Sequence, residues 1–277
     1  MAKITAADVK KLRDMTGSGM MDCKKALAEA EGDFDKAIEI LRKRGEKVAA
    51  KRSDRDAKEG VIIAQVNDDH TKGVIVRLSC ETDFVAKGED FIKFTQDVAD
   101  IALAHMPADI DALKALPMEG SLNVGDKVTE LVGKINEKID ITDYRTLAAD
   151  QVAPYIHMGY RAGVLVGLNQ SGEEAYTAGR DVAMQVAAMR PIALDKSGID
   201  ADTVAKEVEI GKELARAEGK PEAILDKIAQ GRLNKFFKEN TLLDQAFVKD
   251  NKQSVAKYLQ SVDKELTAVG FEHVELS

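Results

Sequence analysis

The chain has 277 residues, of which 40 are Lys or Arg and 48 are Asp or Glu, so its formal net charge is −8. This charge disfavours a broad phosphate-binding surface and makes a protein or a small molecule the expected partner. Aromatic residues are only 5% of the chain and charged residues 32%. That composition suits a helix-rich protein with modest cores better than a large sandwich or barrel, and the length allows two or three compact units.

The two cysteines, Cys23 and Cys80, lie far apart in the chain, and neither belongs to a Cys-x-x-Cys pair. Two such thiols fit a reducing compartment, in which they act as small hydrophobic side chains. The N-terminal residues lack the apolar segment of a signal peptide, and no run of about 18 apolar residues occurs. We therefore expect a soluble, cytoplasmic protein without membrane contact.

Residues 1–45 predict three short helices. Thr5 with Asp8 three residues later resembles a capping box at the start of the first helix. A second helix is expected over 23–30, and a third is expected to end at Gly45. Because about 40 residues form only a very small core, the segment is expected to be a compact three-helix bundle of the ubiquitin-associated (UBA) type.

A basic segment follows the three helices, and we interpret residues 46–59 as a linker. Between positions 42 and 58 the basic side chains are Arg42, Lys43, Arg44, Lys47, Lys51, Arg52, Arg55 and Lys58. Such a run is typical of a solvated helix or linker. The alternatives are a contact with an acidic partner or with RNA, although no aromatic side chain interrupts the run to stack on bases.

The core is expected to be α+β. Residues 60–66 and 73–80 predict two strands of a hairpin, because β-branched residues alternate along them, and the period of 89–105 predicts a helix that covers the hairpin. We assign residues 60–137 to a first core subdomain, which also contains predicted helices over 110–116 and 124–136.

Residues 138–277 are expected to form a second, related core subdomain. A strand over 138–145, a further strand pair within 152–168 and a helix over 173–189 repeat the plan of hairpin plus covering helix. A helix over 254–268 and a strand over 270–276 complete this subdomain.

Residues 203–239 predict a protruding antiparallel helical hairpin inserted into the second subdomain. Gly219-Lys220-Pro221 separates two helical segments, each of which carries a narrow stripe of apolar side chains. The hairpin is interpreted either as an ordinary solvated helix pair or as a docking arm.

The chain shows no sign of an enzyme. It has no P-loop, and Gly17-x-Gly19 lacks the preceding strand and third glycine of a dinucleotide site. Its four histidines share no spacing that would form a zinc cluster, and no serine lies in a nucleophile-elbow context. We expect no catalytic residue, cofactor or metal.

Residues 82–85, Thr-Asp-Phe-Val, fall at the corner between a strand and a helix, where binding residues are common. Phe84 would either close the junction as a buried plug or be displayed to a partner. Met20 and Met21, beside a glycine turn, would either fill a core or serve an adaptable surface. His157 stands at a strand edge, where a lone histidine is usually structural.

Two motifs identify a resemblance. Residues 80–86 read Cys-Glu-Thr-Asp-Phe-Val-Ala, and residues 12–27 contain Thr-Gly-Ser-Gly-Met-Met-Asp-Cys-Lys-Lys-Ala-Leu. Both motifs resemble those of the bacterial elongation factor Ts family, in the family's order. The likeness runs along nearly the whole chain and weakens near the C-terminus.

The resemblance implies a translation elongation factor that acts as a guanine nucleotide exchange factor on the GTPase elongation factor Tu, in its GDP-bound and nucleotide-free states. Thr82, Asp83, Phe84 and Val85 would form a tip that enters the partner's nucleotide-binding domain. The tip would disturb the partner's magnesium and phosphate site and so promote release of GDP.

The resemblance also implies further contacts. Met20 and Met21 would dock the N-terminal bundle on the same domain, and His157 would belong to a second contact motif. Tyr160 and Ala162 depart from the residues expected in that motif. The helical hairpin would touch the partner or mediate a homodimer.

Two alternatives remain open from the residues. The basic segment 42–58 could serve an RNA- or ribosome-binding module, although we expect no direct nucleic-acid contact. The N-terminal bundle, by fold analogy alone, would suit an adaptor for a ubiquitin-like partner.

Overall fold

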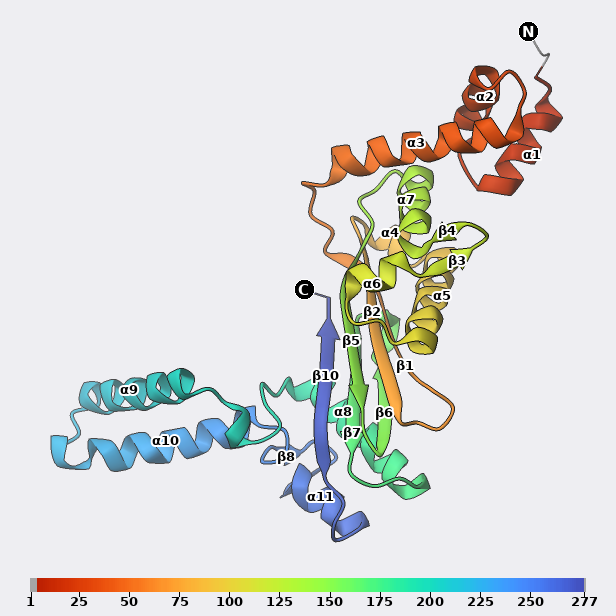
Figure 1. The fold of residues 1–277 in the computed structure, drawn as a ribbon. Coiled ribbons are helices and arrows are strands. Elements are labelled where there is room, and N and C mark those ends of the chain that lie inside the picture. The colour runs from red at the N-terminus through yellow and green to blue at the C-terminus, as the bar shows by residue number, and fades with distance from the viewer. Residues whose placement is uncertain (1–3, 277) are drawn as a thin grey trace.

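The computed structural model describes residues 4–276 (Figure 1). Three helices lie at one end, two antiparallel sheets form the middle, and a pair of helices extends to the side. The expected α+β class is therefore confirmed.

The secondary structure is as follows. The helices are α1 (Ala6–Thr16), α2 (Met20–Glu29), α3 (Phe34–Arg52), α4 (Asp83–Ala86), α5 (Glu89–His105), α6 (Ile110–Ala115), α7 (Val124–Ile135), α8 (Glu173–Met189), α9 (Ala201–Ala217), α10 (Leu225–Asn240) and α11 (Val255–Val262). The strands are β1 (Glu59–Val66), β2 (Lys72–Cys80), β3 (Pro117–Glu119), β4 (Leu122–Asn123), β5 (Asp140–Ala148), β6 (Gln151–Ile156), β7 (Ala162–Leu168), β8 (Ala246–Phe247), β9 (Asp250–Ser254) and β10 (Ala268–Glu275). Short 3₁₀ turns are η1 (Met158–Tyr160), η2 (Lys196–Gly198) and η3 (Glu222–Ile224).

The first helix begins as predicted. The hydroxyl of Thr5 accepts a hydrogen bond from the Asp8 backbone N–H at 3.2 Å, and the Asp8 carboxylate accepts one from the Thr5 backbone N–H at 2.9 Å. This reciprocal pair satisfies two backbone donors at the helix start. The second helix begins at Met20 rather than at residue 23, because Gly19 takes the N-cap position and Asp22 lies in the first turn.

The third helix does not end at Gly45. It continues to Arg52, so the first half of the segment expected to be a linker is helical. Gly45 is buried where α3 crosses α7, and a side chain there would meet the backbone oxygen of Thr129 at 3.0 Å. A glycine at this position therefore allows α3 and α7 to cross closely, and it does not mark the end of a helix.

Two three-stranded antiparallel sheets form the core, in the orders β1-β2-β5 and β6-β7-β10. Helix α5 packs on the first sheet and α8 on the second. In each sheet a hairpin is followed by its helix, and a later strand pairs with the second strand of the hairpin. The expected repetition of hairpin plus covering helix is present, and α5 and α8 have the predicted bounds.

The strand expected over 138–145 forms at Asp140–Ala148, but its partner differs from the prediction. β5 was expected in the second subdomain, whereas it pairs with β2 in the first sheet, with Val76 opposite Tyr144. Ile141 and Tyr144 are buried in the core between this sheet and its helices. Those contacts decide the strand's position, and β10 supplies the third strand of the second sheet.

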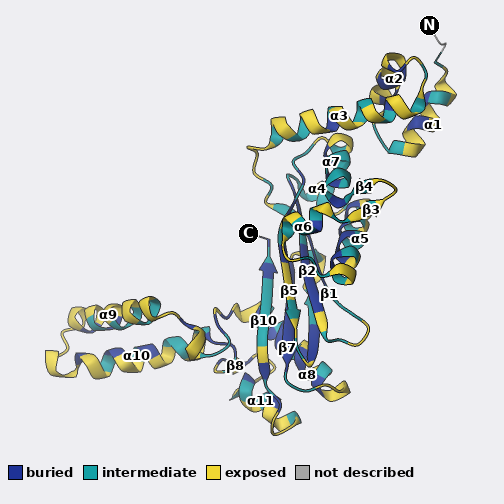
Figure 2. Cartoon of the chain, in the orientation of Figure 1, coloured by how far each residue is buried: buried dark blue, intermediate teal, exposed yellow. Residues whose placement is uncertain are grey.

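The two sheets share an apolar layer. Its buried members come from both sheets, namely Ile62, Ala64, Ile75, Val152, Leu165, Val274 and Leu276. Buried residues run along the strands, while exposed residues cover most of α9 and α10 (Figure 2). The sheets and their helices thus provide a rigid base at which turns and corners are displayed.

Helices α9 and α10 lie side by side along their length (Figure 1). Ala215, Leu225, Ala229 and Leu233 are buried in the seam between them. Gly219, in the left-handed region at φ +74°, lies in the connecting turn as expected, but α10 begins only at Leu225, after η3.

The C-terminal helix is shorter than predicted. α11 starts after its N-cap, Ser254, and ends at Val262 instead of reaching residue 268. The final strand, β10, agrees with the expectation to within two residues. None of the helices within residues 4–276 is both long enough and apolar enough to cross a lipid bilayer.

Candidate functional site

The predicted corner between strand and helix is present at residues 81–86. β2 ends at Cys80, and Thr82 is the N-cap of the short helix α4. The Thr82 hydroxyl accepts a hydrogen bond from the backbone N–H of Val85 at 3.5 Å. Val85 and Ala86 pack against the first core, which fixes the inner side of α4.

Phe84 points away from that core. Its relative exposure is 86%, although phenylalanine is usually buried. The interpretation of Phe84 as a plug for the junction is therefore wrong. The ring is displayed from a short helix whose neighbouring residues are held in place.

Asp83, beside Phe84, is also accessible. Its carboxylate accepts a hydrogen bond from the Lys87 ammonium at 2.6 Å, one helical turn later. That bond and the charge of Lys87 lower the pKa of Asp83, so the tip carries a carboxylate at neutral pH.

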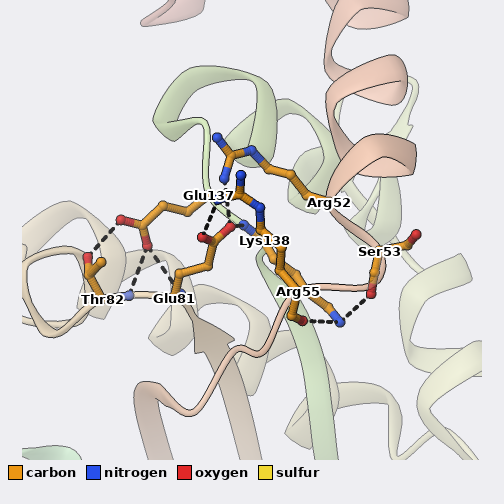
Figure 3. A network of polar contacts seen from close by, with 7 residues as sticks. All are labelled: Arg52, Ser53, Arg55, Glu81, Thr82, Glu137 and Lys138. Carbon is orange, nitrogen blue, oxygen red and sulfur yellow. Dashed lines mark hydrogen bonds and ion pairs between the residues drawn. The ribbon is translucent and has the colours of Figure 1, made fainter.

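The carboxylate of Glu137 binds the backbone and side chain of the corner (Figure 3). It accepts hydrogen bonds from the backbone N–H groups of Glu81 and Thr82, both at 3.1 Å, and from the Thr82 hydroxyl at 2.7 Å. Glu137 follows α7, which ends at Ile135. The corner is thus fixed by a residue 55 positions away in the sequence.

Glu81 links the same corner to α3. Its side chain is only 16% exposed and forms ion pairs with Arg52 at 2.8 Å and Arg55 at 2.9 Å. It also accepts a hydrogen bond from the backbone N–H of Lys138 at 2.6 Å. Burial opposes ionisation, but the Lys138 N–H and the two guanidinium groups outweigh it and lower the pKa of Glu81 to about 2.

The neighbouring thiol is shielded from solvent. Cys80 is fully buried, and burial together with the charge of Glu137 raises its pKa to about 12. Cys23 is likewise a buried free thiol. Both behave as the small hydrophobic side chains expected from the sequence.

A second exposed turn lies at the same end of the sheets. His157 precedes η1 and is exposed, and its Nδ1 lies 3.2 Å from the Tyr155 hydroxyl. The turn is tied to the first sheet because Arg161 forms an ion pair with Glu59 at 3.1 Å. Glu59 is the strand partner of Cys80, so the His157 turn and the Phe84 corner flank the same region.

Met158, next to His157, is 85% exposed, and the sequence did not single it out. The only signal in the sequence was its place between a strand and Gly159. The network at Glu81 and Glu137 was also missed, because its members come from segments distant in the chain.

Met20 and Met21, at the start of α2, are 56% and 62% exposed. The interpretation that they fill the bundle core is therefore wrong. Both lie on α2, which packs on α3 and is drawn apart from α4 (Figure 1), so the structure does not join them to the corner in one continuous site.

Within residues 4–276 no group of three or more His, Cys, Asp or Glu side chains is arranged to hold a metal ion. A cavity of about 480 Å³ lies between α3, α7 and the start of β5, with Ala49, Thr129 and Lys138 among its lining residues. The corner itself displays the exposed ring of Phe84 rather than enclosing a pocket.

Comparison with known proteins identifies the family of the chain. The family model described as "Elongation factor TS" matches residues 81–277. The chain is 59% identical over 276 residues to "Elongation factor Ts" of Christiangramia forsetii, with both chains covered completely. It is 53% identical to that of Amoebophilus asiaticus, with 98% of each chain covered, and 43% identical to that of Porphyromonas gingivalis, with 99% of this chain and 98% of the relative covered. The chain therefore belongs to the elongation factor Ts family of translation elongation factors.

Proposed function

We propose that this protein is a guanine nucleotide exchange factor for the GTPase elongation factor Tu. The observation that carries the proposal is the exposed ring of Phe84 on a corner fixed by Glu81, Thr82 and Glu137. A large apolar side chain on a rigid support is typical of an anchor residue at a protein interface.

The corner acts on the partner by mechanical displacement. Phe84 inserts between helices of the partner's nucleotide-binding domain, while Asp83 brings a negative charge close to the magnesium and phosphate site. Thr82 and Val85 hold the helical turn that carries both. The tip performs no covalent chemistry, so the protein is not an enzyme in that sense and needs no cofactor.

The thermodynamic basis is linkage. A factor that binds the nucleotide-free GTPase more tightly than the GDP-bound form must weaken GDP binding by the same factor. To accelerate release, the protein also engages the GDP-bound partner, forming a ternary complex from which GDP departs.

Further contacts extend the interface. Met20 and Met21 on α2 dock the N-terminal helices on the same partner domain, and His157 contributes a second contact beside the corner. These residues are accessible, as such roles require. The protein works in the cytoplasm, without direct binding of nucleic acid or membrane.

The units of the chain follow from this assignment. Helices α1, α2 and the first part of α3, which continues past residue 45 to Arg52, form a UBA-like unit, and the core consists of two related subdomains. We place the division between them after β5, near residue 149, because β5 belongs to the first sheet. Helices α9 and α10 form the helical-hairpin arm, which touches the partner or a second copy of the chain.

The alternative function, RNA or ribosome binding through residues 42–58, is less favoured. Six of the eight basic side chains of that segment form ion pairs with acids of the same chain, namely Arg42, Lys43, Arg44, Arg52, Arg55 and Lys58. Cations that are already paired contribute less to binding of phosphate groups.

Two binding measurements separate the functions. The immobilised chain should retain nucleotide-free elongation factor Tu and release it when excess GDP is added. Binding to bulk RNA, measured over a range of salt concentrations, should be weak throughout. Retention of RNA that falls steeply with salt, together with failure to retain elongation factor Tu, would overturn the proposal.

A further inference from the structure

Helix α3 joins the N-terminal helices to the core without a break. In its first half Ala37 is fully buried among the N-terminal helices, with Ile38 and Leu41 packed beside it. In its second half Val48 and Ala49 pack against the core of the first sheet. The helix has 19 residues, so it spans roughly 28 Å at 1.5 Å per residue.

The middle of α3 is fixed by a close crossing with α7. Two glycines meet there, since a side chain at Gly133 would lie 2.9 Å from the Cα atom of Gly45. A side chain at Gly45 would lie 3.0 Å from the backbone oxygen of Thr129. Neither neighbour can move aside as the end of a flexible side chain would, so the two helix backbones touch directly.

The C-terminal end of α3 is fixed a second time, at the base of the corner (Figure 3). Arg52, the last residue of α3, is as little exposed as its partner Glu81, at 16%. Just beyond the helix, the Lys138 ammonium donates hydrogen bonds to the backbone oxygens of Ser53 at 2.6 Å and Arg55 at 2.8 Å. Glu81 itself directly precedes the tip residues.

We propose that α3 is a rigid strut that holds Met20 and Met21 at a fixed position relative to Phe84, so that both contact the same partner molecule at once. The crossing at Gly45 and Gly133 and the anchor at Glu81 are its two fixed points. Gly45, Gly133 and Glu81 are therefore positioning residues. The inference rests on the proposed function, since it names how two of the proposed contacts are coupled.

The physical consequence is a gain in effective concentration. When one contact forms, a rigid strut presents the other at its site, and the second contact becomes intramolecular. Loosening the strut should therefore weaken binding of the partner while leaving the action of a bound Phe84 unchanged.

The first experiment uses Gly133→Ala, with Gly270→Ala in β10 as the matched control. Both changes add one methyl group, but a side chain at Gly270 would meet only Leu147 Cδ1, at an ordinary contact distance of 3.5 Å. For Gly133→Ala, the concentration of exchange factor that gives half-maximal GDP release from elongation factor Tu should rise roughly tenfold or more. The maximal rate should remain, and the control should match the wild type.

A double-mutant cycle then separates a strut from a merely structural role. In a chain that carries Met20→Ala and Met21→Ala, the further change Gly133→Ala should have no additional effect, because no second contact is left to position. Gly45→Ala, on the other side of the same crossing, gives the same test should Gly133→Ala not fold. If the glycine change weakens partner binding as much in the chain without Met20 and Met21 as in the wild type, in both cycles, the proposal is overturned.

A distance measurement tests the strut without the partner. Spin labels at the exposed positions Lys25 on α2 and Lys93 on α5 can be introduced as cysteines, because both native thiols are buried. A single narrow distance distribution that broadens or shifts in Gly133→Ala supports the strut. A broad distribution in the wild type contradicts it, whether or not the protein promotes exchange.

Discussion

The carboxylate of Glu137 accepts hydrogen bonds from both the hydroxyl and the backbone N–H of Thr82, at 2.7 and 3.1 Å. This pair holds the residue that begins α4, and so it fixes the direction in which Phe84 leaves the protein. One support of the proposed tip is therefore a side chain from the segment after α7.

Replacing Glu137 by Ala should loosen the corner. Three donors on Glu81 and Thr82 lose their acceptor, and leaving such partly buried groups unsatisfied costs about 1–3 kcal/mol. Urea unfolding should show this loss relative to the wild type. The exposed Glu213→Ala on α9 is the matched control and should change the free energy of unfolding little. Equal stability of the two variants would show that Glu137 does not support the corner.

Glu81 should make stability depend on pH in the acid range. Its pKa is lowered from 4.5 to about 2 in the folded protein, so the folded state gains stability above the unfolded pKa. That gain is lost as the pH falls from about 4.5 through 2. The difference in free energy of unfolding between the wild type and Glu81→Gln should shrink over this range. A difference that stays constant between pH 5 and 2 would contradict the assigned ion pairs.

Two phenylalanines near the corner should respond differently to truncation. Phe91 in α5 is 2% exposed and belongs to the first core, whereas Phe84 is 86% exposed. Phe91→Ala should therefore cost about 3–5 kcal/mol of stability, and Phe84→Ala less than about 0.5 kcal/mol. Thermal unfolding followed by circular dichroism measures both. A large loss for Phe84→Ala would mean that its ring packs within its own chain.

Neither thiol should react in the folded protein. Cys23 and Cys80 are buried, and the pKa of Cys80 is raised to about 12, so little thiolate is available at pH 8. Iodoacetamide should label neither residue under native conditions and both in guanidinium chloride. Rapid labelling of Cys80 in the native protein would contradict the burial of the residue that precedes the corner.

Local sequence patterns predicted the elements whose periodicity is long and regular. α5 and α8 have the predicted bounds, and β1 and β2 differ from the prediction by a single residue, because amphipathic helices and alternating strands carry their own signal. The corner was found for the same reason, since it lies between two such elements.

What failed depends on contacts between distant segments. Gly45 looks like a helix end in the sequence, and only its contact with α7 shows why the helix continues. The alternation of β5 suits either sheet, and its pairing with β2 is decided by the burial of Ile141 and Tyr144. The exposure of Phe84 also runs against the burial tendency of its residue type, because Val85 and Ala86 occupy the inner side of α4.

Stopped-flow release of a fluorescent GDP from elongation factor Tu tests the role of Phe84 most directly. Phe84→Ala is compared with the wild type and with Ile192→Ala, which truncates an exposed apolar residue after α8. Loss of an anchor side chain worth about 2 kcal/mol should slow catalysed release more than tenfold, while the control keeps the wild-type rate. An undiminished rate for the folded Phe84→Ala variant would contradict the assignment of Phe84 as the displacing residue.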